Sequence, residues 1–218
     1  MTSRQDELVT TAEVEDVVAA IEGVNLKAPW NDVAPSLRVA LPRRRPLPPG
    51  AEDLPELEYA PGIRAALGLD IGPAMLFVSH QQLADWGVAK EHAFERALEN
   101  VRKRVAARKQ FALMHERIAG VPTMAFQSRE GWASSLLLLP DELTRVLGRR
   151  NGLLLAPMRD LLMLMPLDCD PELPYSLLEH FVESDMNALD LPVLSLIDGR
   201  LSVLLPESPE PQGRQPMH

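Results

Sequence analysis

The sequence contains one cysteine and few glycines, and each of these shortages excludes one class of functional site. Cys169 has no second cysteine to pair with, so neither an intrachain disulfide nor a Cys-x-x-Cys motif can form. It lies between Asp168 and Asp170, and neighbouring carboxylates raise the pKa of a thiol, so we interpret it as a structural residue. The 12 glycines fall mostly at expected helix ends and turns, which leaves no glycine-rich phosphate loop and no dinucleotide fingerprint.

Long apolar runs are also absent. The longest, Leu136–Leu139 and Leu161–Met165, are far shorter than the ~20 residues that a membrane-spanning helix needs. The first residues carry a positive charge with no apolar stretch behind it, so no secretory signal is expected. We therefore predict a cytoplasmic protein with no membrane partner.

Positive charge is scarce: 31 acids against 22 bases give a net charge of −9 at pH 7. A chain of this charge repels nucleic acid at long range. Its two basic clusters, Arg43–Arg45 and Arg102–Arg104, also lack the interleaved aromatic residues of a single-strand binder. We therefore expect no nucleic-acid partner.

Short catalytic signatures are missing as well. The chain has no His-Glu-x-x-His metal motif and no Gly-x-Ser-x-Gly nucleophile elbow. Its histidines are scattered along the chain rather than grouped with other metal ligands. The sequence therefore predicts neither a metal nor another cofactor.

What the chain does contain is enough apolar residues, 46% of 218, for one sizeable hydrophobic core. Many of its 20 prolines lie between Asn25 and Pro61, and proline provides no backbone N–H for a central strand. We therefore predict an N-terminal helix and a proline-rich extended arm on the surface (residues 1–62), an α+β core domain (63–205) and a disordered tail (206–218).

Hydrophobic periodicity and turn signals predict the elements of the core domain. Helices are expected at His80–Trp86 with Ser79 as its cap, at Lys90–Lys109, from Asp141 as a cap to Leu147, and directly after Asp170-Pro171. Strands are expected at Met75–Val78 and in three hairpins: Thr123–Gln127 with Ala133–Leu139, Leu153–Ala156 with Leu161–Met165, and Val193–Ile197 with Arg200–Leu205. The last hairpin turns at Asp198-Gly199, a strong hairpin signal. The fold class that follows is α+β, with a mixed, mostly antiparallel sheet of about six or seven strands and helices packed on one face.

One charged pair, Arg159-Asp160, lies between two strongly apolar runs. A charge in such a place must reach solvent or find a partner, because an isolated buried ion is very costly. In one interpretation Asp160 closes a turn and Arg159 points outward. In the other, the pair lines a cleft at the sheet edge and meets a ligand.

Several short segments are similar, in the same order, to those of a known family: Leu69-Asp70, Ala97–Asn100, Ala133-Ser134, Ala156–Asp160 and Leu191–Ser195. From about Ile63 to Leu205 the chain resembles the YtpQ-like bacterial proteins, a family of unknown function. The recurrent polar positions of that family then correspond to Asp70, Asn100, Ser134 and Asp160. Trp132 departs from the pattern, because relatives often have an acid there.

These polar residues are expected to meet at one end of the sheet, around a small polar ligand. The candidate ligand-binding residues are Asp70, Asn100, Ser134, Arg159 and Asp160. The same residue types also form turns and helix caps. No base lies next to Ser134 to activate it, so no catalytic residue is predicted.

The function that fits these features is a non-catalytic binding or interaction module for a protein, peptide or small ligand. The alternative is a hydrolase-type enzyme in which Asp70 and Asp160 act as acid and base or hold a metal. That alternative places the two carboxylates within about 4–6 Å of each other. A flat sheet edge would also permit a homodimer.

Overall fold

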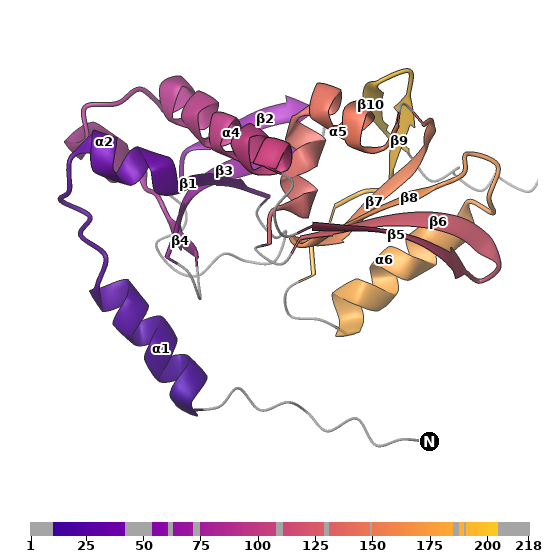
Figure 1. Cartoon of the computed structure of the whole chain (residues 1–218), viewed down its shortest axis with the longest axis horizontal. Helices are drawn as coiled ribbons and strands as arrows, with labels where there is room; N and C mark the ends of the chain where they lie inside the picture. The colour runs from indigo at the N-terminus through magenta and orange to yellow at the C-terminus, as the bar shows by residue number, and fades with distance from the viewer. Residues whose placement is uncertain are drawn as a thin grey trace, which may run out of the picture.

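The computed structural model describes residues 11–41, 54–60, 63–71, 75–107, 111–128, 131–148, 150–184, 188–189 and 191–204. Across these ranges the chain forms two antiparallel sheets with helices packed against them (Figure 1). The predicted α+β class and the antiparallel pairing are confirmed. The strands divide between two sheets, of four and six strands, where the sequence suggested one.

The smaller sheet is built around β3 (Ile63–Asp70). Its neighbours are β1 (Leu37–Ala40) and β2 (Glu56–Ala60), and β4 (Met75–Phe77) pairs with the end of β3. Alternate residues of β3, Ile63, Ala65, Leu67 and Leu69, are buried in the main core. This face of the sheet packs against the long helix α4 (Lys90–Ala107).

Part of the segment predicted as a surface arm, Leu37–Ala40, is instead the buried strand β1. All four residues of β1 are buried, and they pair with Ala66–Leu69 of β3. The prolines lie outside β1 and β2, so their missing N–H groups do not interrupt the ladders. Residues 42–53 and 61–62 of this segment, and the predicted tail after 205, lie outside the described residues.

The larger sheet has the order β10-β9-β7-β8-β6-β5. Its strands are β5 (Phe111–Ile118), β6 (Val121–Ser128), β7 (Gly152–Met158), β8 (Leu161–Met165), β9 (Leu194–Ile197) and β10 (Arg200–Val203). Two of the three predicted hairpins, β7 with β8 and β9 with β10, are confirmed. Asp198 and Gly199 take φ of 51° and 77°, as the tight turn between β9 and β10 requires.

Two predictions in this region are wrong. Ala133–Leu138 forms a 3₁₀ helix, η3, and the hairpin partner of β6 is β5, which the sequence analysis missed. Ser128 Oγ accepts hydrogen bonds from the N–H groups of Trp132 and Ala133, at 2.9 and 3.0 Å, and so caps the start of η3. An apolar run that is buried on all sides fits a strand and a short helix equally well, which explains the error.

Helices cover both faces of the larger sheet, so the prediction of helices on one face is also wrong. Leu154 and Leu164 belong to the main core, whereas Leu155 and Met163 form a second cluster with α6 (Glu172–Ser184). Figure 1 shows α6 on one side of the strands and α5 (Pro140–Val146) on the other. The apolar runs of β7 and β8 send alternate side chains to opposite faces, and each face needs a cover.

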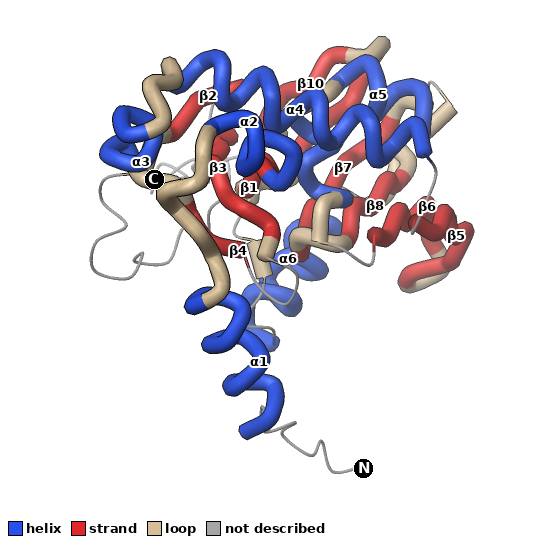
Figure 2. The backbone as a smooth tube through the Cα atoms, turned by 60° about the vertical axis from the view of Figure 1, so that its left-hand side comes forward, coloured by secondary structure: helices blue, strands red, loops and turns tan. Residues whose placement is uncertain are grey.

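The remaining helices are α1 (Thr11–Glu22), α2 (Trp30–Val33), η1 (Ala34–Ser36) and α3 (His80–Asp85). Ser79 caps α3 as predicted, since its Oγ accepts a hydrogen bond from the N–H of Gln82 at 3.1 Å. Asp141 does not cap α5, which begins at Pro140. Both views place α1 away from the two sheets (Figures 1 and 2). No helix in the described ranges is long and apolar enough to cross a bilayer.

A buried serine connects the two sheets. Ser135, on η3, donates a hydrogen bond from Oγ to the carbonyl of Val39 in β1 at 2.9 Å. Ser135 is buried, and η3 itself packs on β8 and β6 of the larger sheet. The hydrogen bond therefore joins β1, an edge strand of the smaller sheet, to η3, which packs on the larger sheet.

Ser135→Ala tests this connection. We expect it to lower the free energy of unfolding by about 1–3 kcal/mol, because a buried carbonyl loses its side-chain donor. Urea denaturation measures the change, with Ser176→Ala as the control because Ser176 is exposed on α6 and makes no side-chain hydrogen bond to a described residue. Equal effects of the two substitutions would contradict a role of Ser135 in joining the sheets.

Candidate functional site

Asp70, the first of the predicted site residues, takes part in an ion-pair cluster at the end of β3. Its carboxylate pairs with the guanidinium of Arg38 on β1, and Arg104 of α4 approaches it at 3.6 Å. Arg38 is only 9% exposed, so Asp70 compensates a nearly buried positive charge. The contacts of Asp70 fit a structural role.

Asn100 is buried in α4 and holds two backbone carbonyls. Its Nδ2 donates hydrogen bonds to Ala34 O at 2.8 Å and to Leu37 O at 2.9 Å. Both amide protons are therefore used inside the protein. Asn100 fixes the junction of η1 and β1 to the middle of α4.

The structure brings Ser134, Arg159 and Asp160 together through their backbones. Ser134 N–H donates to Arg159 O at 3.0 Å, and Ser128 N–H donates to Asp160 O at 2.8 Å. Ser134 is buried, and the turn between β7 and β8 lies against the start of η3. The five predicted residues thus form two groups: Asp70 and Asn100 beside α4, and the other three at this turn.

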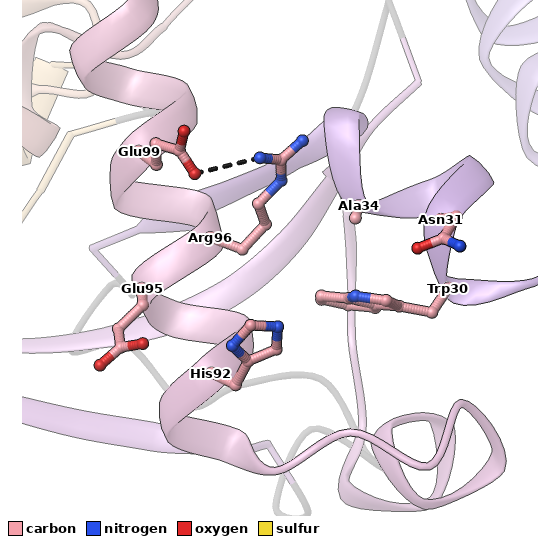
Figure 3. A pocket seen from close by; sticks show the side chains of 7 residues that line it. All are labelled: Trp30, Asn31, Ala34, His92, Glu95, Arg96 and Glu99. Carbon is pink, nitrogen blue, oxygen red and sulfur yellow. Dashed lines mark hydrogen bonds and ion pairs between the residues drawn. The ribbon is translucent and has the colours of Figure 1, made fainter.

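A different place has the shape of a binding site. A groove of about 400 Å³ lies between α2 with η1 and the exposed side of α4 (Figure 3). We call it the α2–α4 groove. It is lined by Trp30, Asn31, Ala34, His92, Glu95, Arg96 and Glu99.

Aromatic rings form one wall of the α2–α4 groove. The Trp30 ring lies 5.9 Å, between ring centroids, from the rings of both His92 and Trp86. In Figure 3 the Trp30 ring extends from α2 toward His92. Trp86 Nε1 is buried and has no hydrogen-bond partner among the described residues. Trp30 is therefore held in place by other rings while it lines the groove.

The charged side chains that line the groove lie on α4, on the same helix face as His92. Arg96 Nη1 pairs with Glu99 Oε2 at 3.0 Å, and Lys103 Nζ pairs with Glu99 Oε1 at 2.8 Å. Hydrogen bonds from Lys103 and then from Arg96 lower the pKa of Glu99, which is therefore firmly ionised. Glu95 has no hydrogen bond or ion pair with any side chain in the described ranges. One carboxylate of the groove is thus available to a ligand.

Sequence reasoning missed this groove although half of it follows a simple spacing. His92, Glu95, Arg96 and Glu99 recur at the i, i+3, i+4 and i+7 positions of one helix face. The spacing shows a polar face but not which segment lies opposite. The other half comes from Trp30, about 60 positions earlier, in the segment interpreted as a surface arm.

Comparisons with family models, with curated proteins and with solved structures find no match for this chain. The resemblance to the YtpQ-like family stays a prediction. Within the described ranges, no three His, Cys, Asp or Glu side chains are grouped so as to hold a metal ion.

Asp70→Asn tests the structural interpretation of Asp70. The substitution keeps the shape of the side chain but removes the charge that balances Arg38, so we expect a loss of about 2–4 kcal/mol in unfolding free energy. The control is Glu142→Gln, which breaks the exposed Arg145–Glu142 pair and should cost less than about 1 kcal/mol. If Asp70→Asn costs no more than the control in chemical denaturation, the structural interpretation is wrong.

Proposed function

We propose that this protein is a non-catalytic binding module that takes a positively charged side chain of a peptide partner in the α2–α4 groove. The observation that carries the proposal is the pairing of an aromatic wall, Trp30 with His92, and an available carboxylate, Glu95, in one groove. Membership of the YtpQ-like family and a cytoplasmic setting belong to the same proposal.

The aromatic wall favours a cationic group. A lysine or arginine head within about 6 Å of a tryptophan face gains about 0.5–1 kcal/mol when exposed and about 2 kcal/mol when desolvated. The Trp30 ring is half-buried against Trp86 and His92, so it is already ordered before a ligand arrives. Binding then loses little side-chain entropy at this position.

The charges of the groove favour the same ligand. Glu95 supplies a carboxylate with no competing partner among the described residues, while Glu99 stays ionised between Arg96 and Lys103. The whole chain carries a net charge of −9, which attracts basic peptides at long range and speeds their association.

Two further groups suit a peptide backbone. Arg96 uses one nitrogen for Glu99, and a guanidinium has five N–H donors in all. Asn31 lies beside Trp30 on α2, and its amide has no hydrogen bond to any described residue (Figure 3). Both side chains can donate to peptide carbonyls while the cation lies against Trp30.

The hydrolase alternative has weaker support. It needs Asp70 and Asp160 as a working pair, but Asp70 is engaged by the guanidinium groups of Arg38 and Arg104. A carboxylate that compensates a nearly buried arginine is poorly suited to exchange a proton in each turnover.

Titration with short capped peptides tests the proposed function. We expect an arginine-rich or lysine-rich peptide to bind by calorimetry and a glutamate-rich peptide of the same length not to bind. Trp30→Ala should weaken binding about 10-fold, because it removes up to about 2 kcal/mol of cation–π attraction. Glu95→Gln should weaken it about threefold, as expected for one exposed ion pair.

Glu91→Gln is the matched control, since Glu91 is an exposed acid on α4 that does not line the groove. Trp30→Phe keeps an aromatic ring and should retain most of the affinity, which separates loss of the ring face from loss of folding. Equal affinity of wild type and Trp30→Ala, or no binding of basic peptides by wild type, would refute the proposal.

A further inference from the structure

The helix α1 presents apolar side chains to solvent. Val18 is 47% exposed and Ile21 is 45% exposed, and a spacing of three residues puts them on one face of the helix. Leu26, just beyond the end of α1, is 38% exposed. An apolar face of this kind on a helix that stands away from the sheets is typical of a helix that docks elsewhere.

The charge of α1 restricts what can cover that face. Thr11–Glu22 contains four acids, Glu13, Glu15, Asp16 and Glu22, and no base. Glu15 and Glu22 lie three residues before and four residues after Val18, so both border the apolar face on one side. The matching surface must be apolar in the middle and positive at its rim.

One surface of the chain meets this description. A groove of about 440 Å³ lies on the larger sheet, with the buried Met124 and Leu164 in its floor and the exposed Arg150 and His115 at its rim. We call it the β6–β8 groove. Arg150 is exposed and pairs with no carboxylate among the described residues, whereas the lining contains one acid, Glu116.

The chain's own α1 is poorly placed to reach its own β6–β8 groove. Gln82 Nε2 donates to Leu26 O at 2.9 Å, which ties the segment after α1 to α3. Only Gly23–Asn25 lies between α1 and this tie, and three residues span at most about 11 Å. Both views show α1 far from β5 and β6 (Figures 1 and 2). A second copy has no such restraint.

We infer that α1 of one copy docks in the β6–β8 groove of a second copy, with Val18 and Ile21 on the apolar floor and Glu15 or Glu22 against Arg150. If each copy lends its helix to the other, the exchange closes into a two-fold dimer in which both grooves are filled. The inference is independent of the proposed peptide site, because α2 and α4 do not take part in it.

Sedimentation equilibrium of the full chain tests the inference. We expect a monomer–dimer equilibrium with a dissociation constant of about 1–100 μM, as for a small, transient interface. Glu15→Lys with Glu22→Lys, and separately Arg150→Glu, should each weaken the dimer about 10-fold or more. The chain that carries all three substitutions should regain most of the affinity, since the charges are again complementary.

Arg102→Glu is the matched control, because Arg102 is an exposed base on α4, which packs on the smaller sheet, and it does not line the β6–β8 groove. It should leave the dimer unchanged. A wild-type chain that stays monomeric up to about 1 mM overturns the inference, and so does a dimer that survives the α1 and Arg150 reversals. Circular dichroism of each variant verifies that the monomers are folded.

Discussion

The side-chain amide of Asn100 joins α4 to the segment that forms α2, η1 and β1. From the middle of α4 it reaches the carbonyls of Ala34 and Leu37, the first residues of η1 and of β1. Those two hydrogen bonds fix the distance between α4 and the segment that carries Trp30. The α2–α4 groove exists because α2, which runs directly into η1, is held at that distance.

The same strand β1 connects the two sheets. Its backbone pairs with β3 on one side, and its Val39 carbonyl accepts the hydroxyl proton of Ser135 from η3. Side chains from both sheets, such as Leu67 and Leu154, then share one hydrophobic core. Arg38 on β1 is nearly buried, and the carboxylate of Asp70 on β3 compensates its positive charge. The short strand β1 thus contributes contacts to the hydrophobic core, to the α2–α4 groove and to the ion-pair cluster around Asp70.

The parts of the fold that local chemistry decides could be predicted from the sequence. Ser79 caps α3, and Asp198-Gly199 takes the positive φ values that join β9 and β10. The periodicity of α4 is visible because its apolar stripe covers several turns. Each of these signals lies within a few residues of the structure that it produces.

The errors come from long-range pairing. Nothing near β1 shows that β3 will pair with it, and prolines around it suggest an exposed segment. η3 resembles a strand because its leucines are buried on all sides, and its helical form depends on the cap from Ser128. The site residues chosen from the sequence, such as the buried Asn100 and the partly buried Asp70, make contacts that hold the fold. Trp30 is far from α4 in the sequence, and the two come together in the α2–α4 groove only after folding.

The central claim is that Asn100 holds α2 and η1 on α4 and so forms the groove. Native-state hydrogen exchange of the Asn100→Ala chain tests it most directly. We predict that the amides around Ala34–Leu37 lose protection, whereas those of β7 and β8 keep theirs. A uniform loss of protection across both sheets would contradict the claim, because Asn100 would then contribute only to global stability.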